Sequence, residues 1–152
     1  MEKHYADVVR SGDVYRLGEY ALTQESIIAF AEQWDPQWFH VDPDAADNGP
    51  FGGLIASGIQ TLAIYQKLAV EAVFDKFHVL CGKEVTDVRF WQPVRPGSVI
   101  TGTMTTTTVR PEAGRGRALV AYDVELTDKD AGVVLTAVMT VYIKLPEDHL
   151  GS

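Results

Sequence analysis

An acid and a histidine stand five positions apart in a short segment rich in aromatic residues, Trp34-Asp35-Pro36-Gln37-Trp38-Phe39-His40. Carboxylates and imidazoles are the side chains that most often exchange protons with substrates near neutral pH. If Asp35 and His40 converge on one water molecule, they can supply both the base that activates it and the acid that completes its addition to a double bond. This segment is therefore the first candidate for a catalytic site.

A glycine-punctuated loop comes next, with the sequence Pro50-Phe51-Gly52-Gly53-Leu54-Ile55-Ala56-Ser57-Gly58, and it leads into an apolar stretch. Ser57 is a suitable N-cap for a helix that runs to about Phe74. The N–H groups that begin a helix favour negative charge, and a glycine lets a ligand approach the backbone closely. The amide of Gly58 is thus a candidate donor to a carbonyl oxygen that gains charge during a reaction.

These residues also have simpler interpretations, which the spacing alone leaves open. Asp35 could merely end a helix before Pro36, and His40 could be a loop histidine whose hydrogen bonds are satisfied. Asp42 fits a helix cap better than a catalytic group. Two carboxylates and one histidine with no second His or Cys nearby are a weak ligand set, so no metal is expected. No Rossmann or P-loop glycine motif is present, and we expect no bound cofactor.

The composition limits the possible partners. The chain has 152 residues, enough for one domain over 1–152, and its net charge of −8 disfavours nucleic acid and anionic membrane surfaces. No apolar stretch is long enough to cross a bilayer, and no secretory signal is recognised. The single cysteine, Cys81, cannot form an internal disulfide, which favours a cytoplasmic location. Its apolar surroundings predict a small core residue.

Periodicity predicts the elements that position the candidate site. Residues 1–12 are polar and are expected to be peripheral, like 146–152. The ranges expected to form elements are an extended segment at 14–22 with a bend at Gly18, an amphipathic helix at 24–34 capped by Thr23, a loop or single turn at 36–48, and a largely buried helix from Ser57 to about Phe74.

From Phe77 onward the pattern changes to the period of two that is typical of strands. Five stretches rich in Val, Thr, Tyr and Ile are separated by turn residues, at 78–81, 84–91, 98–110, 116–128 and 133–144. The fold class is therefore α+β, with a long helix against a curved antiparallel sheet. Open strand edges in such a sheet predict a homodimer or a higher homo-oligomer.

The Asp35–His40 interval with Asp42, followed by Phe51 to Gly58, resembles the hydratase motif of the MaoC-like family of (R)-specific enoyl-CoA hydratases. The later segments Arg89-Phe90 and Pro93-Val94-Arg95-Pro96-Gly97 look like the family's subsequent strand and turn, so the resemblance extends over about 12–145. It implies the hot dog fold and a hydro-lyase that adds water to a trans-2-enoyl thioester.

The resemblance implies that Asp35 and His40 handle the water and that the Gly58 amide is the oxyanion donor. It further implies a substrate site that includes Ser57, Trp38, Phe51 and Gly53. Coenzyme A would enter as part of the substrate, and Arg89, Arg95 or Lys83 could reach its phosphates. The sequence departs from the family pattern at four positions: Gln37 and Trp38 replace the usual Asn-Pro, Ser57 stands where the family often has His, and Ala63 stands where some members have a serine. Trp38 and Ala63 bear on the acyl specificity, and a branch of the family shares Ser57.

Two other functions remain compatible with these residues. The first is a hot dog acyl-CoA thioesterase, which usually carries its carboxylate on the long helix or the preceding loop; here that helix offers only Glu71, late in its sequence. The second is a non-catalytic acyl-CoA-binding module, for which Trp38 and Ala63 are the main support.

Overall fold

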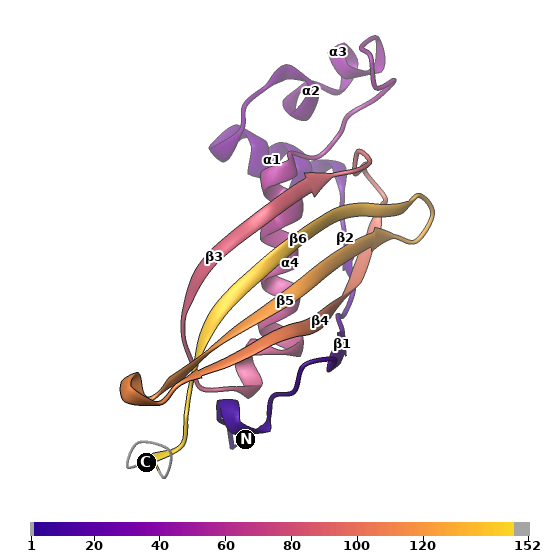
Figure 1. The fold of residues 1–152 in the computed structure, drawn as a ribbon. Helices are drawn as coiled ribbons and strands as arrows, with labels where there is room; N and C mark the ends of the chain where they lie inside the picture. The colour runs from indigo at the N-terminus through magenta and orange to yellow at the C-terminus, as the bar shows by residue number, and fades with distance from the viewer. Residues whose placement is uncertain (1, 148–152) are drawn as a thin grey trace.

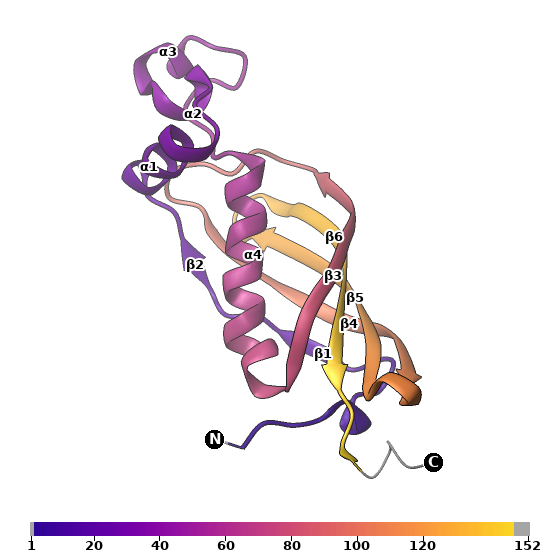
Figure 2. The same cartoon turned by 90° about the vertical axis from the view of Figure 1, so that its left-hand side faces the viewer.

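The computed structural model describes residues 2–147. A six-stranded antiparallel sheet curves around one long helix, α4 (Gly58–Ala72), as Figures 1 and 2 show. The α+β hot dog fold expected from the sequence is confirmed. The strands are β1 (Val14–Arg16), β2 (Tyr20–Ala21), β3 (Val79–Phe90), β4 (Val99–Glu112), β5 (Arg117–Asp128) and β6 (Gly132–Lys144).

The strands lie in the order β1-β4-β5-β6-β3, and β2 also pairs with β4. The extended segment at 14–22 is interrupted at Gly18, where a bend was expected, so it forms two short strands, β1 and β2. One sequence prediction needs correction here. The predicted strands at 78–81 and 84–91 are one continuous edge strand, β3, which absorbs the irregular sequence through register shifts against β6.

Three short helices gather beyond the N-terminal end of α4 (Figure 2). They are α1 (Gln24–Trp34), α2 (Trp38–Val41) and α3 (Pro43–Asp47). The start and end of α1 match the prediction, since the Thr23 side chain accepts from the Ser26 N–H and the Ser26 hydroxyl accepts in return from the Thr23 N–H. Asp42 caps α3 by accepting from the Ala45 N–H, which confirms its expected role.

Helix α4 buries one face against the concave side of the sheet. Its core-facing side chains include Ile64, Tyr65 and Leu68, which join the sheet residues in one hydrophobic core. The opposite face is less covered than the apolar sequence predicts, since Ile59 and Val70 are exposed. The difference arises because one sheet can cover only one side of a helix. Among the described residues, no helix is long and apolar enough to span a membrane.

Two further expectations differ from the structure. The N-terminal segment 1–12 contributes to the core, because the 3-10 helix η1 (Ala6–Val8) turns Ala6 inward and Val9 is also buried. Cys81 is exposed rather than buried, because it lies on the edge strand β3. Two more 3-10 helices complete the elements, η2 (Phe74–Lys76) and η3 (Ala113–Arg115). The end of the expected C-terminal periphery, 148–152, lies outside the described residues.

Candidate active site

Asp35 and His40 come together at the end of α4 where the three short helices gather. Asp35 is the C-cap of α1 and breaks the helix before Pro36, whereas His40 lies on the single turn α2. The His40 Nε2 atom is 3.3 Å from Asp35 Oδ2. His40 is 4% exposed, and the side chain of Asp35 is 21% exposed. Asp35 does end α1 and His40 is a buried histidine with partners for both ring nitrogens, as the simpler interpretation expects, but the fold also brings the two side chains into contact.

The proton on the His40 ring is assigned by its other contact. Nδ1 lies 2.7 Å from the carbonyl oxygen of Ile55, which can only accept a hydrogen bond. Nδ1 therefore carries hydrogen, and Nε2 is the atom that faces the carboxylate. The backbone pairs as well, since the Ile55 N–H donates to the Phe39 carbonyl. These contacts hold α2 against the loop that precedes α4.

Both carboxylate oxygens of Asp35 accept hydrogen bonds. The Ser57 hydroxyl donates to Oδ2 at 2.7 Å, and the Gln37 side-chain amide donates to Oδ1 at 2.8 Å. The Ser57 hydrogen bond is the largest influence on the pKa of Asp35 and lowers it from its ordinary value; partial burial opposes this, and Gln37 and His40 add to the lowering. Asp35 is therefore ionised near neutral pH.

Gly58 is the first residue of α4, directly after the N-cap Ser57. The N–H at this position has no partner within its own helix, and within residues 2–147 no other group accepts from it. A Cβ atom built on Gly58 would lie 2.8 Å from the Phe90 ring. Glycine is thus required for Phe90 to pack against the start of α4.

A cavity of about 550 Å³ adjoins these groups. Asp35, His40, Ser57 and Gly58 all line it, together with the predicted substrate-site residue Phe51. The cavity is large enough for a small organic ligand. The three predicted catalytic residues and Ser57 therefore line the same cavity.

The other two predicted substrate-site residues are not in the lining of this cavity. The half-exposed Trp38 ring packs over Gly49, where an added Cβ would lie 2.7 Å from it. Gly53 lies on the loop beside Arg95, whose guanidinium donates to the Phe51 carbonyl at 2.7 Å. Both residues shape the loop that carries Phe51.

Another part of the cavity wall was not predicted from the sequence. This wall is formed by residues at and after the end of β3, with one residue from β6: Phe90, Trp91, Gln92, Pro93, Val94 and Val134. The Ala56 N–H donates to the Val94 carbonyl at 2.7 Å and so ties this wall to the loop before Ser57.

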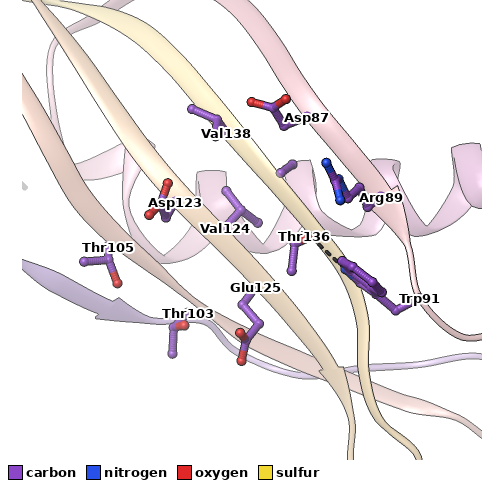
Figure 3. A pocket seen from close by; sticks show the side chains of 11 residues that line it. Asp87, Arg89, Trp91, Thr103, Thr105, Asp123, Val124, Glu125, Thr136 and Val138 are labelled. Atoms are coloured by element: carbon purple, nitrogen blue, oxygen red, sulfur yellow. Dashed lines mark hydrogen bonds between the residues drawn. The ribbon is translucent and has the colours of Figure 1, made fainter.

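A second hollow, of about 460 Å³, lies on the sheet face away from α4 (Figure 3). Arg89 lines it, together with three carboxylates, Asp87, Asp123 and Glu125. The excess of negative charge makes this surface unsuited to the phosphates of coenzyme A. None of the predicted catalytic residues lies there. The site of interest is therefore the cavity at the start of α4.

Known proteins similar to this chain identify its family. The sequence profile described as "MaoC like domain" matches residues 7–129. The chain is 41% identical over 85 residues to the uncharacterized protein YdeM of Bacillus subtilis, covering 56% of this chain and 60% of that protein. It is 39% identical over 84 residues to 3-hydroxyacyl-thioester dehydratase Z of Mycobacterium tuberculosis, covering 54% and 56%. The aligned stretches thus span little more than half of these relatives.

Among solved structures, the chain is similar to the MaoC-like dehydratase from Rhodospirillum rubrum. The TM-score is 0.81 with 26% identity, and the match covers 94% of this chain and 98% of that one. Because the family profile extends over most of the chain, and a solved MaoC-like protein has the same fold, the chain belongs to the MaoC-like domain family.

Proposed function

We propose that this protein reversibly hydrates a trans-2-enoyl thioester, such as an enoyl-CoA, to the 3-hydroxyacyl thioester. One observation carries the proposal: Asp35 Oδ2 contacts both the Ser57 hydroxyl and His40 Nε2. All three residues line a cavity that Gly58 also lines. This arrangement provides proton transfer and oxyanion stabilisation side by side, and water addition next to a carbonyl needs both.

In the proposed reaction, a water molecule is held by Asp35 and His40. As its oxygen bonds to the β-carbon, the Asp35–His40 pair accepts one of its protons, and the electrons of the double bond move toward the thioester oxygen. The Gly58 N–H, at the positive end of α4, stabilises the resulting enolate. The pair then returns one proton to the α-carbon. Water has been added, and both side chains are in their starting protonation state.

The partner implied by this reaction is an acyl-CoA thioester, with coenzyme A as part of the substrate. We also propose a homodimer. Within the described residues, β3 is an edge strand that pairs on one side with β6, and Leu80, Val85 and Phe90 on it are exposed. A long edge strand with apolar side chains favours pairing with another chain. Sedimentation equilibrium would distinguish a dimer from a monomer.

The second candidate enzyme is a thioesterase, which would need a catalytic carboxylate from α4 in the cavity. Glu71, the one acid on α4, forms an ion pair with Lys67 on an exposed face and does not line the cavity. The case for a non-catalytic binding module is also weakened, because neither Trp38 nor Ala63 lines the cavity.

The test is to add the protein to crotonyl-CoA and to follow the absorbance of the conjugated thioester, with a thiol reagent present in a parallel sample. Hydration predicts loss of the absorbance without release of thiol. Asp35→Asn and His40→Gln should each abolish the change while the circular dichroism spectrum stays that of the wild type. Full activity in either folded variant would refute the assignment, and thiol release would favour the thioesterase.

A further inference from the structure

Ser57 is fully buried, and its hydroxyl group both accepts and donates a hydrogen bond. Its oxygen accepts from the Ile59 N–H at 3.2 Å, as expected of the N-cap of α4. Its one proton is directed to Asp35 Oδ2 at 2.7 Å. A hydroxyl has a single proton to donate, so this side chain links the first turn of α4 to the carboxylate and to nothing else.

We propose that Ser57 is a positioning residue that holds Asp35 in the ionised, correctly oriented state on which the proposed hydration depends. It touches Asp35 rather than the reacting atoms, and it precedes Gly58 in the chain. The Ser57 side chain therefore fixes the position of the Asp35 carboxylate relative to the Gly58 amide, which is proposed to bind the enolate. The inference rests on the proposed function for its kinetic consequences only, since the state of Asp35 can be measured without substrate.

The charge and burial of the contact explain why it would matter. A hydrogen bond to an ionised acceptor is stronger than one between neutral groups, and more so where water is excluded. Ser57 also lies at the positive end of α4, so its hydroxyl is polarised toward the acid. The lowered pKa of Asp35 agrees with this arrangement.

The second donor to Asp35 provides an internal comparison. Gln37 reaches Oδ1, but it is exposed and stands two residues away on the same loop. Water can replace an exposed donor at little cost, whereas it cannot easily replace one that is fully buried. Removal of Ser57 should therefore change Asp35 far more than removal of Gln37.

The decisive experiment measures the carboxyl pKa of Asp35 by carbon NMR in the free protein and the pH profile of kcat/KM with crotonyl-CoA. In Ser57→Ala, we expect the pKa of Asp35 to rise toward its ordinary value and the acidic limb of the profile to move with it. We expect kcat/KM at neutral pH to fall about 10- to 100-fold. Gln37→Ala should raise the pKa of Asp35 and lower kcat/KM far less than Ser57→Ala does, because the Gln37 donor is exposed and water can replace it.

Because Ser57 also caps a helix, the loss of a cap needs its own control. Thr23→Ala removes the N-cap of α1, and the Thr23 side chain accepts from the Ser26 N–H at the end of that helix far from Asp35. This variant should lose stability but keep the Asp35 pKa and the pH profile. If Ser57→Ala fails to fold, Ser57→Gly replaces it, since glycine is a tolerated N-cap and also lacks the hydroxyl.

The outcomes separate the two proposals. An unchanged Asp35 pKa and an unchanged pH profile in a folded Ser57 variant would overturn the positioning role, even if the wild type hydrates crotonyl-CoA. An Asp35 pKa that rises in Ser57→Ala, in a protein that turns over no enoyl thioester, would support the positioning role and refute the proposed function.

Discussion

Replacing Gly58 by alanine tests the proposed oxyanion donor without removing any charged group. The added methyl group would lie 2.8–3.0 Å from three atoms of the Phe90 ring. Both residues line the cavity, so the methyl and the displaced ring alter the space in front of the Gly58 amide. The change is therefore local to the site where the thioester oxygen is expected.

The structure predicts a small effect of this substitution on stability. Alanine is favoured over glycine in a helix by up to about 1 kcal/mol. Against this, Phe90 is 52% exposed and can turn away, at a cost of about 0.5–1.5 kcal/mol if it leaves its preferred rotamer. The two effects nearly cancel, so the free energy of unfolding should change by about 1 kcal/mol or less.

The effect on turnover should be much larger. A displacement of about 1 Å between a substrate and its stabilising groups can cost about 100-fold in rate. We expect a loss of that size in the absorbance assay with crotonyl-CoA, with the thermal transition close to that of the wild type. Gly49→Ala is the matched control, because its methyl group would press on the exposed Trp38 ring, which does not line the cavity.

The activities of Gly58→Ala and Gly49→Ala can together refute the proposed role of the Gly58 amide. If Gly58→Ala retained wild-type kcat/KM while folding normally, the start of α4 would not be where the carbonyl is bound. If Gly49→Ala lost as much activity as Gly58→Ala, the effect would belong to the loop as a whole and not to the amide.

Three further results concern pH and packing. Because the pKa of Asp35 is lowered in the folded protein, its contribution to stability is present above its ordinary value of 3.8 and is lost as pH falls through the folded value; chemical denaturation at several pH values should show this loss in wild type but not in Asp35→Asn. Gly102→Ala should destabilise the protein by about 1–3 kcal/mol, because the new methyl group would overlap the Glu125 carbonyl and Leu126. Tyr122→Phe should be neutral or stabilising in thermal denaturation, because within the described residues its buried hydroxyl has no hydrogen-bond partner.

Local signals in the sequence were sufficient to predict the elements that carry the site. Thr23 and the Asp35-Pro36 pair fix the two ends of α1, and Ser57 fixes the start of α4, because caps and proline act on their immediate neighbours. The spacing of Asp35 and His40 with the glycine loop indicated which polar residues meet, and the structure brings them together on one cavity wall.

Long-range packing explains what could not be predicted. The cavity wall made by Phe90 to Val94 depends on how β3 ends above α4, which no local pattern specifies. Cys81 has the sequence surroundings of a core residue, but its exposure depends on β3 being an edge strand. The burial of Ala6 likewise depends on where the N-terminal segment meets the body of the fold. In each case, the place of the segment in the tertiary structure outweighs the local preference of its residues.

In the proposed reaction, Asp35, His40 and the Gly58 amide add water across a carbon–carbon double bond. Turnover of crotonyl-CoA in oxygen-labelled water, followed by mass spectrometry of the products, tests this reaction directly. Hydration predicts an intact thioester that carries the label in a new hydroxyl group at the β-carbon. Label found instead in a free carboxylic acid, with release of coenzyme A, or unlabelled and unchanged substrate, would contradict it.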